Sequence, residues 1–474
     1  MMPRFDLCVV GAGPSGMAAA VMAARHGLSV ALLDERPSAG GQIYRGLEDG
    51  PFRHSAALGA EYQEGSKAIA SLRNADLSVC FGANLWRVDL SDTGGVASYG
   101  QAGASRRLAF GDLVLATGAM ERPVPFEGWA LPGIMGVGAA QLLLKTSAIV
   151  PSRRLVLAGN GPLMLLFATQ LLQLGVEISA ILDTSVKVSR VAAAIRHARG
   201  LWLNRDKIRK GAGLIRAIRR AGVPVYRNVS SLSASGSERI AAVTFDGDKG
   251  QTTLSVDTLL IHEGIIPNTQ LSRALGCRHV WDEGQQCLRP DIDRFGESSL
   301  KRVFIVGDGA AITGAIAAPA SAEIAIGRIL DRDGRSDERS RATVRKAAAT
   351  LARERAFRPF LDELYTPRLA AARQSDATLV CRCEEVSAGT LRSALKDGAI
   401  GPSQAKVFTR CGMGACQGRV CGPIVSQLIA SETGRPIGDV GQYNIRYPLK
   451  PVTLFDMARC GVDEERHEGT EHVA

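Results

Sequence analysis

Gly11-Ala12-Gly13-Pro14-Ser15-Gly16 follows an apolar run at residues 5–10 and precedes an Ala-rich segment at 17–26. Strand, glycine-rich turn and helix in this order are the start of a dinucleotide-binding βαβ unit. The first glycine makes the turn, the second lets a pyrophosphate approach the backbone, and the third packs the helix on the strand. The N-terminus of the helix offers unpaired N–H groups to phosphates. The sequence therefore predicts a dinucleotide site at the start of the chain.

An acidic residue follows the next apolar run at the position that such a unit requires. Residues 28–33 read as a second strand, and Asp34, Glu35 and Arg36 come directly after it. Asp34 lies 18 residues after Gly16, where a carboxylate can accept hydrogen bonds from ribose hydroxyls. Both strands, the helix and the acid are thus in register, which makes the pattern far more specific than six residues alone.

Three further stretches resemble the fingerprints of the two-dinucleotide-domain flavoproteins, which include glutathione reductase-like enzymes. They are Gly40-Gly41-Gln42, the strand that ends in Thr117-Gly118-Ala119, and the strand that ends in Gly307-Asp308. The resemblance covers roughly residues 1–330 and implies FAD, with Asp308 near the ribityl chain. The alternative for Asp308 is a cap of a helix that begins near Ala310. The FAD contacts expected are Gly11, Gly13, Pro14, Ser15, Gly16, Asp34, Glu35, Arg36, Gly41, Gln42, Thr117, Gly118, Gly307 and Asp308.

A second glycine motif follows the apolar run at 155–158, in the slot where this family has its NAD(P) domain. It contains Gly159 and Gly161, but Met164 stands where the third glycine belongs. A bulky side chain there should push the helix away from the strand or obstruct the pyrophosphate. Asp183 closes the next strand and could accept a ribose. Three alternatives stay open: a domain that packs but binds nothing, a site for another adenine nucleotide, and a working NAD(P)H site.

Disulfide reductases of the same family carry a pair of redox cysteines beside the flavin. Neither residues 40–46 nor residues 130–160 contain a cysteine pair. Thiol–disulfide chemistry is therefore not expected here. His262 and Glu263 follow an apolar strand near the expected flavin, and a turn with a capping carboxylate is favoured over a catalytic pair. No catalytic residue is assigned.

Five of the ten cysteines lie between Cys381 and Cys421. Cysteines that serve as small hydrophobic residues are scattered, so this clustering indicates a soft metal centre. Zinc sites present two ligand pairs, often with histidine, and no histidine lies between His279 and His467. Several glycines surround the later cysteines and would let backbone N–H groups point at sulfur. A 2Fe–2S cluster is favoured over zinc and over an empty module.

This stretch resembles the iron–sulfur domain of bacterioferritin-associated ferredoxin, in the version fused to amine and glycerol-phosphate oxidoreductases. The motif Thr-Arg-x-Gly-Met-Gly-x-Cys-Gln-Gly-x-x-Cys matches residues 409–421. The resemblance implies Cys381, Cys383, Cys416 and Cys421 as the ligands. Cys411 then occupies a variable position and is the spare.

The net charge of +10 is compatible with an anionic partner, but no nucleic-acid motif accompanies it. Eleven basic residues fall between Lys187 and Arg220, with Leu and Ile between them, and predict a solvated helix face or an interface with an acidic partner. The N-terminus lacks the pattern of a signal peptide, and no apolar run reaches about 18 residues, the length that a spanning helix needs. A cytoplasmic location is expected, with peripheral association at the inner face of the membrane through an electron acceptor as an option.

The predicted fold is α/β: a glutathione reductase-like flavoprotein with two dinucleotide-binding domains and a small C-terminal iron–sulfur domain. A helical stretch that Thr366-Pro367 ends is expected to link the two parts. The expected divisions are an FAD domain in two halves (1–122 and 255–330), an inserted nucleotide domain (123–254), a helical linker (331–373), the 2Fe–2S domain (374–435) and a C-terminal extension (436–474).

Nearly the whole chain resembles the larger accessory flavoprotein of complexes that dehydrogenate amino acids. These include the FAD-dependent larger subunit of octopine and nopaline oxidases, the middle subunit of hydrogen cyanide synthase and the alpha subunit of dye-linked proline or hydroxyproline dehydrogenases. The resemblance lies in residues 40–45, 117–123, 129–134 and 262–268. It implies an electron-transfer subunit with FAD and a 2Fe–2S cluster. It also leaves room for a second nucleotide, ATP or NAD(P), or for FMN at a subunit interface.

Three partners are implied: a flavoprotein subunit resembling D-amino acid oxidase, which oxidises the substrate, a downstream electron acceptor, and a small ferredoxin-like subunit. Two other functions compete with this one. One is a stand-alone NAD(P)H-dependent reductase that passes electrons to an external acceptor. The other is a scaffold needed only for assembly.

Overall fold

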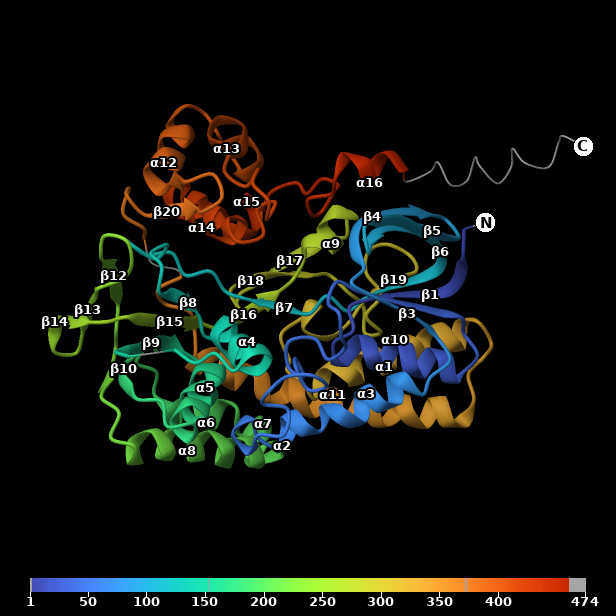
Figure 1. Ribbon diagram of the computed structural model, residues 1–474, viewed down its shortest axis with the longest axis horizontal. Coiled ribbons are helices and arrows are strands. Elements are labelled where there is room, and N and C mark those ends of the chain that lie inside the picture. The colour runs from blue at the N-terminus through green and yellow to red at the C-terminus, as the bar shows by residue number, and fades with distance from the viewer. Residues whose placement is uncertain (1, 152, 371–372, 460–474) are drawn as a thin grey trace, which may run out of the picture.

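The structure is a computed structural model that describes residues 2–151, 153–370 and 373–459 (Figure 1). Its first sheet has the strand order β3-β2-β1-β6-β5-β4, and β19 also pairs with β6. The strands around β1 are parallel, while β4, β5 and β6 are antiparallel. The strands are β1 (Arg4–Val10), β2 (Val30–Asp34), β3 (Ser78–Phe81), β4 (Asn84–Ser91), β5 (Gly94–Gln101), β6 (Ala104–Leu115) and β19 (Val303–Ile305).

Strand β1 is buried on both faces. Leu7 and Val9 belong to one hydrophobic cluster, and Cys8, which points the other way, belongs to another. Such double burial explains why the parallel strands here read as continuous apolar runs. The helices packed against this domain are α1 (Pro14–Arg25), α3 (Gly65–Arg73), α10 (Ala317–Arg332) and α11 (Glu338–Leu364). Short helices lie before α3, namely η1 (Ala56–Leu58) and α2 (Ala60–Gln63).

The second domain is built on a parallel sheet with the order β11-β10-β9-β15-β8. Its strands are β8 (Ile134–Gly136), β9 (Leu155–Asn160), β10 (Ile178–Asp183), β11 (Val225–Tyr226) and β15 (Thr258–Glu263). Its helices are α4 (Val137–Ser147), α5 (Pro162–Gln173), α6 (Arg190–Arg196), α7 (Ala198–Leu203) and α8 (Arg205–Arg220). A three-stranded antiparallel sheet adjoins it, with β12 (Ser231–Ser235), β13 (Ala242–Gly247) and β14 (Gly250–Ser255).

Short two-stranded pieces lie between the domains. The strand β7 (Ala119–Glu121) pairs with β16 (Ile265–Pro267), and β17 (His279–Asp282) pairs with β18 (Cys287–Pro290). Helix α9 (Gln270–Ala274) follows β16. The helix after Asp308 begins later than a cap would require, since η2 (Gly307–Gly309) comes first and α10 starts at Ala317.

The C-terminal part forms a separate lobe above these pieces (Figure 1). It contains β20 (Leu379–Cys381), β21 (Val386–Ser387), α12 (Ala388–Lys396), α13 (Pro402–Thr409), α14 (Cys421–Thr433) and α15 (Ile437–Val440). The chain then runs back toward β4–β6, and the last described element is α16 (Leu454–Arg459). We call residues 379–440 the cysteine module. No helix within the described ranges is long and apolar enough to cross a membrane.

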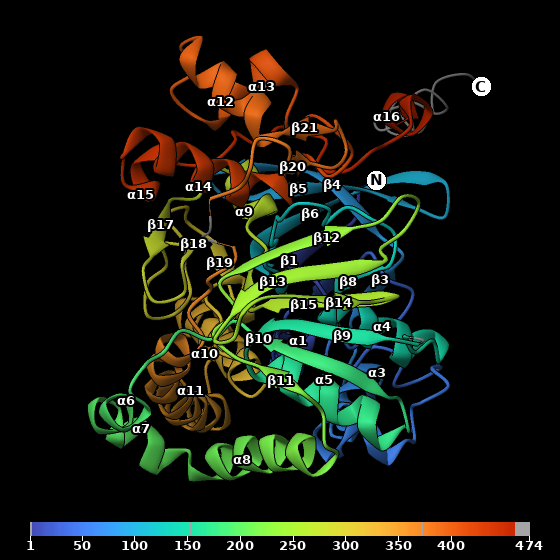
Figure 2. The same cartoon turned by 90° about the vertical axis from the view of Figure 1, so that its left-hand side faces the viewer.

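The basic stretch predicted at 187–220 lies on α6, α7 and α8 along one edge of the molecule (Figure 2). Most basic side chains of α8 are exposed, and Ile218 is its one buried apolar side chain, as in a solvated helix face. The neighbouring α6 and α7 also expose Val191, Ile195 and Trp202, each at about 70%.

Helix α8 contains two glycines whose replacement should stabilise it. A Cβ at Gly213 would meet no atom within 4 Å, and its backbone conformation is an ordinary helical one. Gly213→Ala should therefore raise the free energy of unfolding by about 0.5–1 kcal/mol, because alanine loses less backbone entropy in a helix. Chemical denaturation would measure it. Gly222→Ala is the contrasting variant, since φ there is +69° and the change should destabilise.

Candidate functional site

The first glycine turn presents an accessible surface at the N-terminus of α1. Gly13 and Pro14 are partly exposed, and no side chain caps the helix. The carboxylate of Asp34, at the end of β2, accepts hydrogen bonds from the N–H of Ala12 at 2.6 Å and of Arg36 at 2.8 Å. The turn thus holds free N–H groups beside an anchored carboxylate. Phosphates and a ribose need this combination.

Two glycines of this turn are fixed by close backbone contacts. Gly11 has φ +104°, and a Cβ there would lie 2.4 Å from the carbonyl oxygen of Ala116. A Cβ at Gly16 would lie 1.7 Å from the carbonyl oxygen of Gly11. Helix α1 can therefore approach β1 only with glycine at both positions.

The distant stretches predicted for the flavin gather at the same sheet edge. A Cβ at Gly13 would touch Gly41 at 3.7 Å, and one at Gly307 would meet Ser15 Oγ at 2.6 Å. Thr117 Oγ1 donates to the carbonyl of Asn268 at 3.0 Å. Residues 11–16, 41, 117–118 and 307 therefore form one cradle. Side chains in place of its glycines would fill it.

Asp308 lies in this cradle just after β19. One of its carboxylate oxygens accepts the N–H groups of Thr313 and Gly314, both at 2.9 Å. Burial raises the pKa of the Asp308 carboxyl above its ordinary value. Gln42 Nε2 donates to the carbonyl of Ala119 at 3.2 Å, which ties the Gly40–Gln42 stretch to β7.

Glu35 has a partner that the sequence did not reveal. Its carboxylate pairs with Arg36 and with Lys450, which comes from the C-terminal extension. The N–H of the preceding Leu449 donates to the carbonyl of Trp86 at 3.1 Å. The extension therefore lies against the end of β2, next to Asp34. No motif around Lys450 could have indicated this contact.

The second glycine turn is closed, in contrast to the first. Gly159, Asn160 and Gly161 are all buried, and Asn160 is only 1% exposed. The His262 ring lies across the turn, because a Cβ at Gly161 would come within 3.6 Å of its Cδ2 atom. Met164 does not fill the turn, since its side chain is 2% exposed and belongs to the core. The closure has another cause.

Residues 366–370, which follow α11, run across the carboxyl ends of β9 and β15; we call them the closing strap. Asn160 Nδ2 donates to the carbonyl of Thr366 at 3.3 Å. The Glu263 carboxylate accepts the N–H groups of Arg368, Leu369 and Ala370 at 3.1, 3.0 and 2.8 Å. In open parallel sheets this edge is where ligands bind. Here the chain itself covers it.

His262 and Glu263 are the last residues of β15 and are not in a turn. Glu263 is fully buried and also accepts a hydrogen bond from Thr184 Oγ1 at 2.8 Å. His262 Nδ1 lies 2.7 Å from Glu121 Oε1, and Glu121 accepts the N–H of Gly138 at the start of α4. Glu263 therefore does cap backbone donors, but those of the closing strap. Asp183, the candidate ribose acceptor, bonds the N–H of Ser185 at 3.0 Å.

Glu263→Gln should destabilise the protein by about 2–4 kcal/mol, because an amide would present donors to backbone N–H groups that need an acceptor. Chemical denaturation would measure the change. Glu61→Gln is a matched control, since its carboxylate is 69% exposed and pairs only with Lys210 among the described residues. We expect the control to cost less than about 1 kcal/mol. Equal effects of the two changes would contradict the role assigned to Glu263.

The five clustered cysteines lie together in the cysteine module. The thiols of Cys381, Cys411 and Cys421 are buried, and their sulfur atoms all lie within 4.8 Å of one another. Cys383 is exposed and contacts the thiol of Cys416. Cys411, expected to be the spare, is thus one of the three innermost thiols. The sequence could not show this, because α13 separates Cys411 from β20.

Glycines let the chain wrap tightly around these thiols. A Cβ at Gly414 would lie 2.3 Å from Cys383 Cβ, and one at Gly418 would lie 2.5 Å from the Tyr443 ring. The Tyr443 hydroxyl lies 4.0 Å from Cys421 Sγ. Three thiols within 4.8 Å of one another, with the Cys383 and Cys416 pair in the same module, offer the soft donors that an iron–sulfur cluster needs.

The cysteine module is fastened to the nucleotide domains by hydrogen bonds. Trp129 Nε1 donates to the carbonyl of Leu379 at 2.6 Å, and Gln270 Nε2 donates to that of Gln417 at 3.0 Å. Just after the module, Gln442 Oε1 accepts a hydrogen bond from Arg273 at 2.6 Å, and so does the carbonyl of Tyr443. The thiols are therefore held in a fixed position relative to α9 and Trp129.

Comparison with known proteins agrees with this organisation. Residues 5–328 match the model of the pyridine nucleotide-disulphide oxidoreductase family, and residues 379–431 match the BFD-like [2Fe-2S] binding domain. The A subunit of opine oxidase from Rhizobium meliloti (strain 1021) is 39% identical, over 96% of this chain and 99% of that protein. Hydrogen cyanide synthase subunit HcnB of Pseudomonas aeruginosa is 32% identical, over 96% and 98%.

Among solved structures, L-proline dehydrogenase from P. horikoshii superposes with a TM-score of 0.69 at 18% identity, and the match covers 97% of this chain and 81% of that one. It supports the fold. The family and the geometry together make FAD and a 2Fe–2S cluster the cofactors. The chain belongs to the pyridine nucleotide-disulphide oxidoreductase family, in the group that includes the A subunit of opine oxidase and carries a C-terminal BFD-like [2Fe-2S] binding domain.

Proposed function

We propose that this chain is the electron-transfer subunit of a hetero-oligomeric dehydrogenase or oxidase. The complex would oxidise the C–N bond of an opine, an amino acid or a cyclic imino acid. The observation that supports this most directly is the contrast between the two nucleotide turns, one accessible and one covered by the closing strap. The cysteine module, fastened to the nucleotide domains by Trp129 and Gln270, would then offer electrons a route of exit.

Each part of the chain has a distinct task in this function. FAD exchanges electrons in pairs or singly, whereas a 2Fe–2S cluster carries one electron at a time. We assign the holding of FAD to the Gly11–Gly16 turn, Asp34, the Gly41–Gln42 stretch, Thr117-Gly118 and Gly307-Asp308. We assign the holding of the cluster to Cys381, Cys383, Cys416 and Cys421. Those thiolates would fix the position and the potential of the electron acceptor.

The relatives that match this chain are named as subunits of larger enzymes, so partner subunits are expected here too. We propose that substrate oxidation takes place on a separate flavoprotein subunit resembling D-amino acid oxidase. A downstream acceptor and a small ferredoxin-like subunit would complete the route. A cytoplasmic complex, associated with the inner face of the membrane through that acceptor, would suit this arrangement.

A stand-alone NAD(P)H reductase is the competing function, and the closing strap argues against it. Asn160 and Glu263, at the ends of β9 and β15, both have their side chains bonded to the strap. A pyrophosphate could reach Gly159 and Gly161 only after these hydrogen bonds break. The same obstruction applies to ATP in this turn. FMN at a subunit interface would not use this turn and would not meet the obstruction.

NADH and NADPH should therefore fail to bleach the flavin of the purified chain under anaerobic conditions. Absorbance at the flavin maximum would be followed for an hour with a large excess of either nucleotide. Dithionite, added last, should bleach the flavin and show that it is competent. Full bleaching by NADH within seconds would contradict the electron-transfer assignment and favour the reductase.

The substrate class is tested by reconstitution. Co-purified complex would be mixed anaerobically with a panel of opines, amino acids and cyclic imino acids, and the isolated chain would be treated in parallel. We expect bleaching in the complex with one class of substrate and none in the isolated chain. Bleaching of the isolated chain by the same substrate would place substrate oxidation here and overturn the proposed division of labour.

A further inference from the structure

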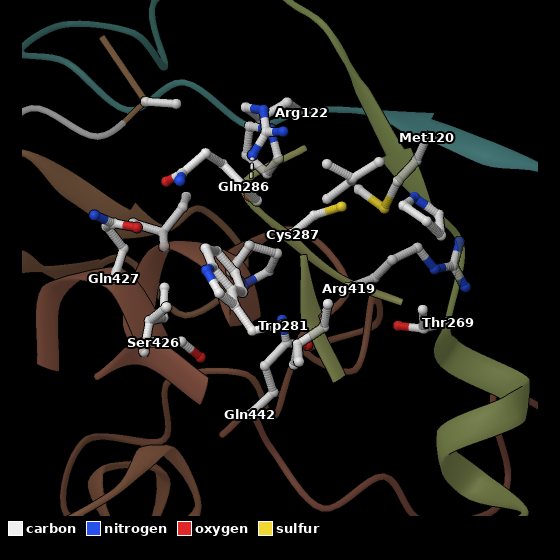
Figure 3. A pocket seen from close by; sticks show the side chains of 18 of the residues that line it. Met120, Arg122, Thr269, Trp281, Gln286, Cys287, Arg419, Ser426, Gln427 and Gln442 are labelled. Atoms are coloured by element: carbon white, nitrogen blue, oxygen red, sulfur yellow. Dashed lines mark hydrogen bonds between the residues drawn. The ribbon is translucent and has the colours of Figure 1, made fainter. Parts of the chain in front are cut away.

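A pocket lies where the flavin domain, the closing strap and the cysteine module meet (Figure 3). The space between its walls, including open solvent at the mouth, is about 860 Å³. Met120 and Arg122 line it from the β7 side, Trp281 and Cys287 from the β17–β18 hairpin, and Arg419 and Ile424 from the cysteine module. None of the residues assigned to FAD lines it, although Asn268, in its wall, accepts a hydrogen bond from Thr117 Oγ1.

The charged side chains that line this pocket are all positive. Among the residues that the structure describes, three arginines line it, Arg122, Arg273 and Arg419, and no aspartate or glutamate does. Arg122 donates to the backbone carbonyls of Glu263, Gln285 and Gln286 and forms no ion pair among the described residues. Arg273 likewise bonds a side-chain amide and a carbonyl. Burial lowers the pKa of Arg273 to about 10, as expected for a cation that lacks a carboxylate partner.

Two hydrogen-bond donors in the pocket lining have no partner. Arg419 Nε and Trp281 Nε1 are both buried, and no acceptor lies within reach in the described part of the chain. Figure 3 shows Trp281 at the centre of the view with Arg419 beside it and Arg122 above. Unpartnered buried donors are rare in proteins because each costs the loss of its hydrogen bond to water. Acceptors from outside the chain would satisfy these donors.

The remaining walls combine apolar side chains with uncharged polar ones, among them Asn268, Gln286 and Gln427. Ile266, Leu288 and Ile424 line the pocket together with several prolines and Met120. A free inorganic ion would use the arginines but not these surfaces. A ligand with an anionic end and an apolar or aromatic body would use both.

We propose that this pocket binds a small organic anion, a carboxylate or a phosphate monoester with an apolar body. The anionic group would bond Arg419 and Trp281, and the body would lie against the apolar walls. Arg419 belongs to the cysteine module, whereas Trp281 and Arg273 belong to the flavin domain. The ligand would therefore clamp the two together and hold the route between the two cofactors in place. This goes beyond the proposed function, since binding can be measured without turnover.

Calorimetry on the purified chain with its cofactors tests the proposal. The probes are phenyl phosphate, phenylacetate, inorganic phosphate and the neutral benzyl alcohol. We expect one of the two aromatic anions to bind with one ligand per chain, and inorganic phosphate and benzyl alcohol to bind at least tenfold more weakly. Trp281→Phe and Arg419→Met should each weaken binding at least tenfold. Arg278→Met is the matched control, because Arg278 is 71% exposed, lies in the same domain and pairs with Asp291 outside the pocket.

Arg419 lies between two proposed cluster ligands, so its variant counts only if the visible spectrum of the cluster is intact. If the cluster is lost in Arg419→Met, the test rests on Trp281→Phe, which lies outside the cysteine module. Three results would overturn the proposal: no binding by either aromatic anion, equal binding of benzyl alcohol, or unchanged affinity in Trp281→Phe. Binding of a partner protein with no binding of the small probes would also overturn it and would assign the arginines to an acidic protein segment.

Discussion

Cys416→Ser is expected to abolish the 2Fe–2S cluster and leave the flavin in place. A serine hydroxyl stays protonated near neutral pH and is a poor donor to a soft metal, so a cluster that needs four thiolates should not assemble. Iron and acid-labile sulfide per chain should fall to near zero, and the EPR signal after reduction should disappear. FAD content should not change, because Cys416 belongs to the cysteine module and the flavin contacts lie in residues 1–330.

Cys411→Ser is the matched control. It is a stringent control because the Cys411 thiol lies among the buried thiols of the module. Cys411 is buried with Cys381 and Cys421, whereas Cys416 is only partly buried and lies against Cys383. The ligand set that we propose requires the cluster to survive in Cys411→Ser. Loss of the cluster there, with retention in Cys416→Ser, would replace Cys416 by Cys411 in the ligand set.

Gly16→Ala is expected to remove FAD from the purified protein. The added Cβ would lie 1.7 Å from the carbonyl oxygen of Gly11, which is backbone and cannot rotate away. Helix α1 would have to move off β1, and its N-terminus would leave the position of the pyrophosphate. Overpacking of this kind costs about 3 kcal/mol, or about a 100-fold loss of affinity. Flavin absorbance per chain and titration of the apoprotein with FAD would measure it.

Gly100→Ala is the control for this variant. Gly100 lies on β5 of the same sheet, and a Cβ there would meet no atom within 4 Å. It should bind FAD as the unchanged protein does. Wild-type flavin content in Gly16→Ala would show that the turn does not hold the pyrophosphate, and the FAD site would then have to be reassigned.

The first nucleotide site could be predicted from the sequence because its determinants are local. The turn, the helix start and Asp34 all lie within 24 residues, and each has a residue type that its backbone geometry requires. The cysteine module was also predictable as a metal site, since the thiols cluster along the chain. Which thiols lie innermost was not, because the positions of Cys381 and Cys411 depend on how α13 packs.

The closing strap could not be predicted, although the sequence contains all its parts. Glu263 and Ala370 are 107 positions apart, and nothing in the sequence around either residue indicates that they meet. The sequence drew attention to Met164 as the defect in the second nucleotide domain, but that side chain packs in the core. A missing glycine indicated a changed site, and the cause of the closure lay in a contact between distant segments. Lys450 and Glu35 are a second case of the same kind.

The central claim is that electrons leave the flavin through this chain's own thiolates, and one measurement tests it most directly. The native complex would be purified anaerobically, mixed with its substrate and frozen for EPR, in parallel with a complex that carries Cys416→Ser. The account predicts the signal of a reduced 2Fe–2S cluster in the native complex, and loss of both that signal and turnover with the physiological acceptor in the variant. An absent signal in fresh native complex, or undiminished turnover in the variant, would contradict it.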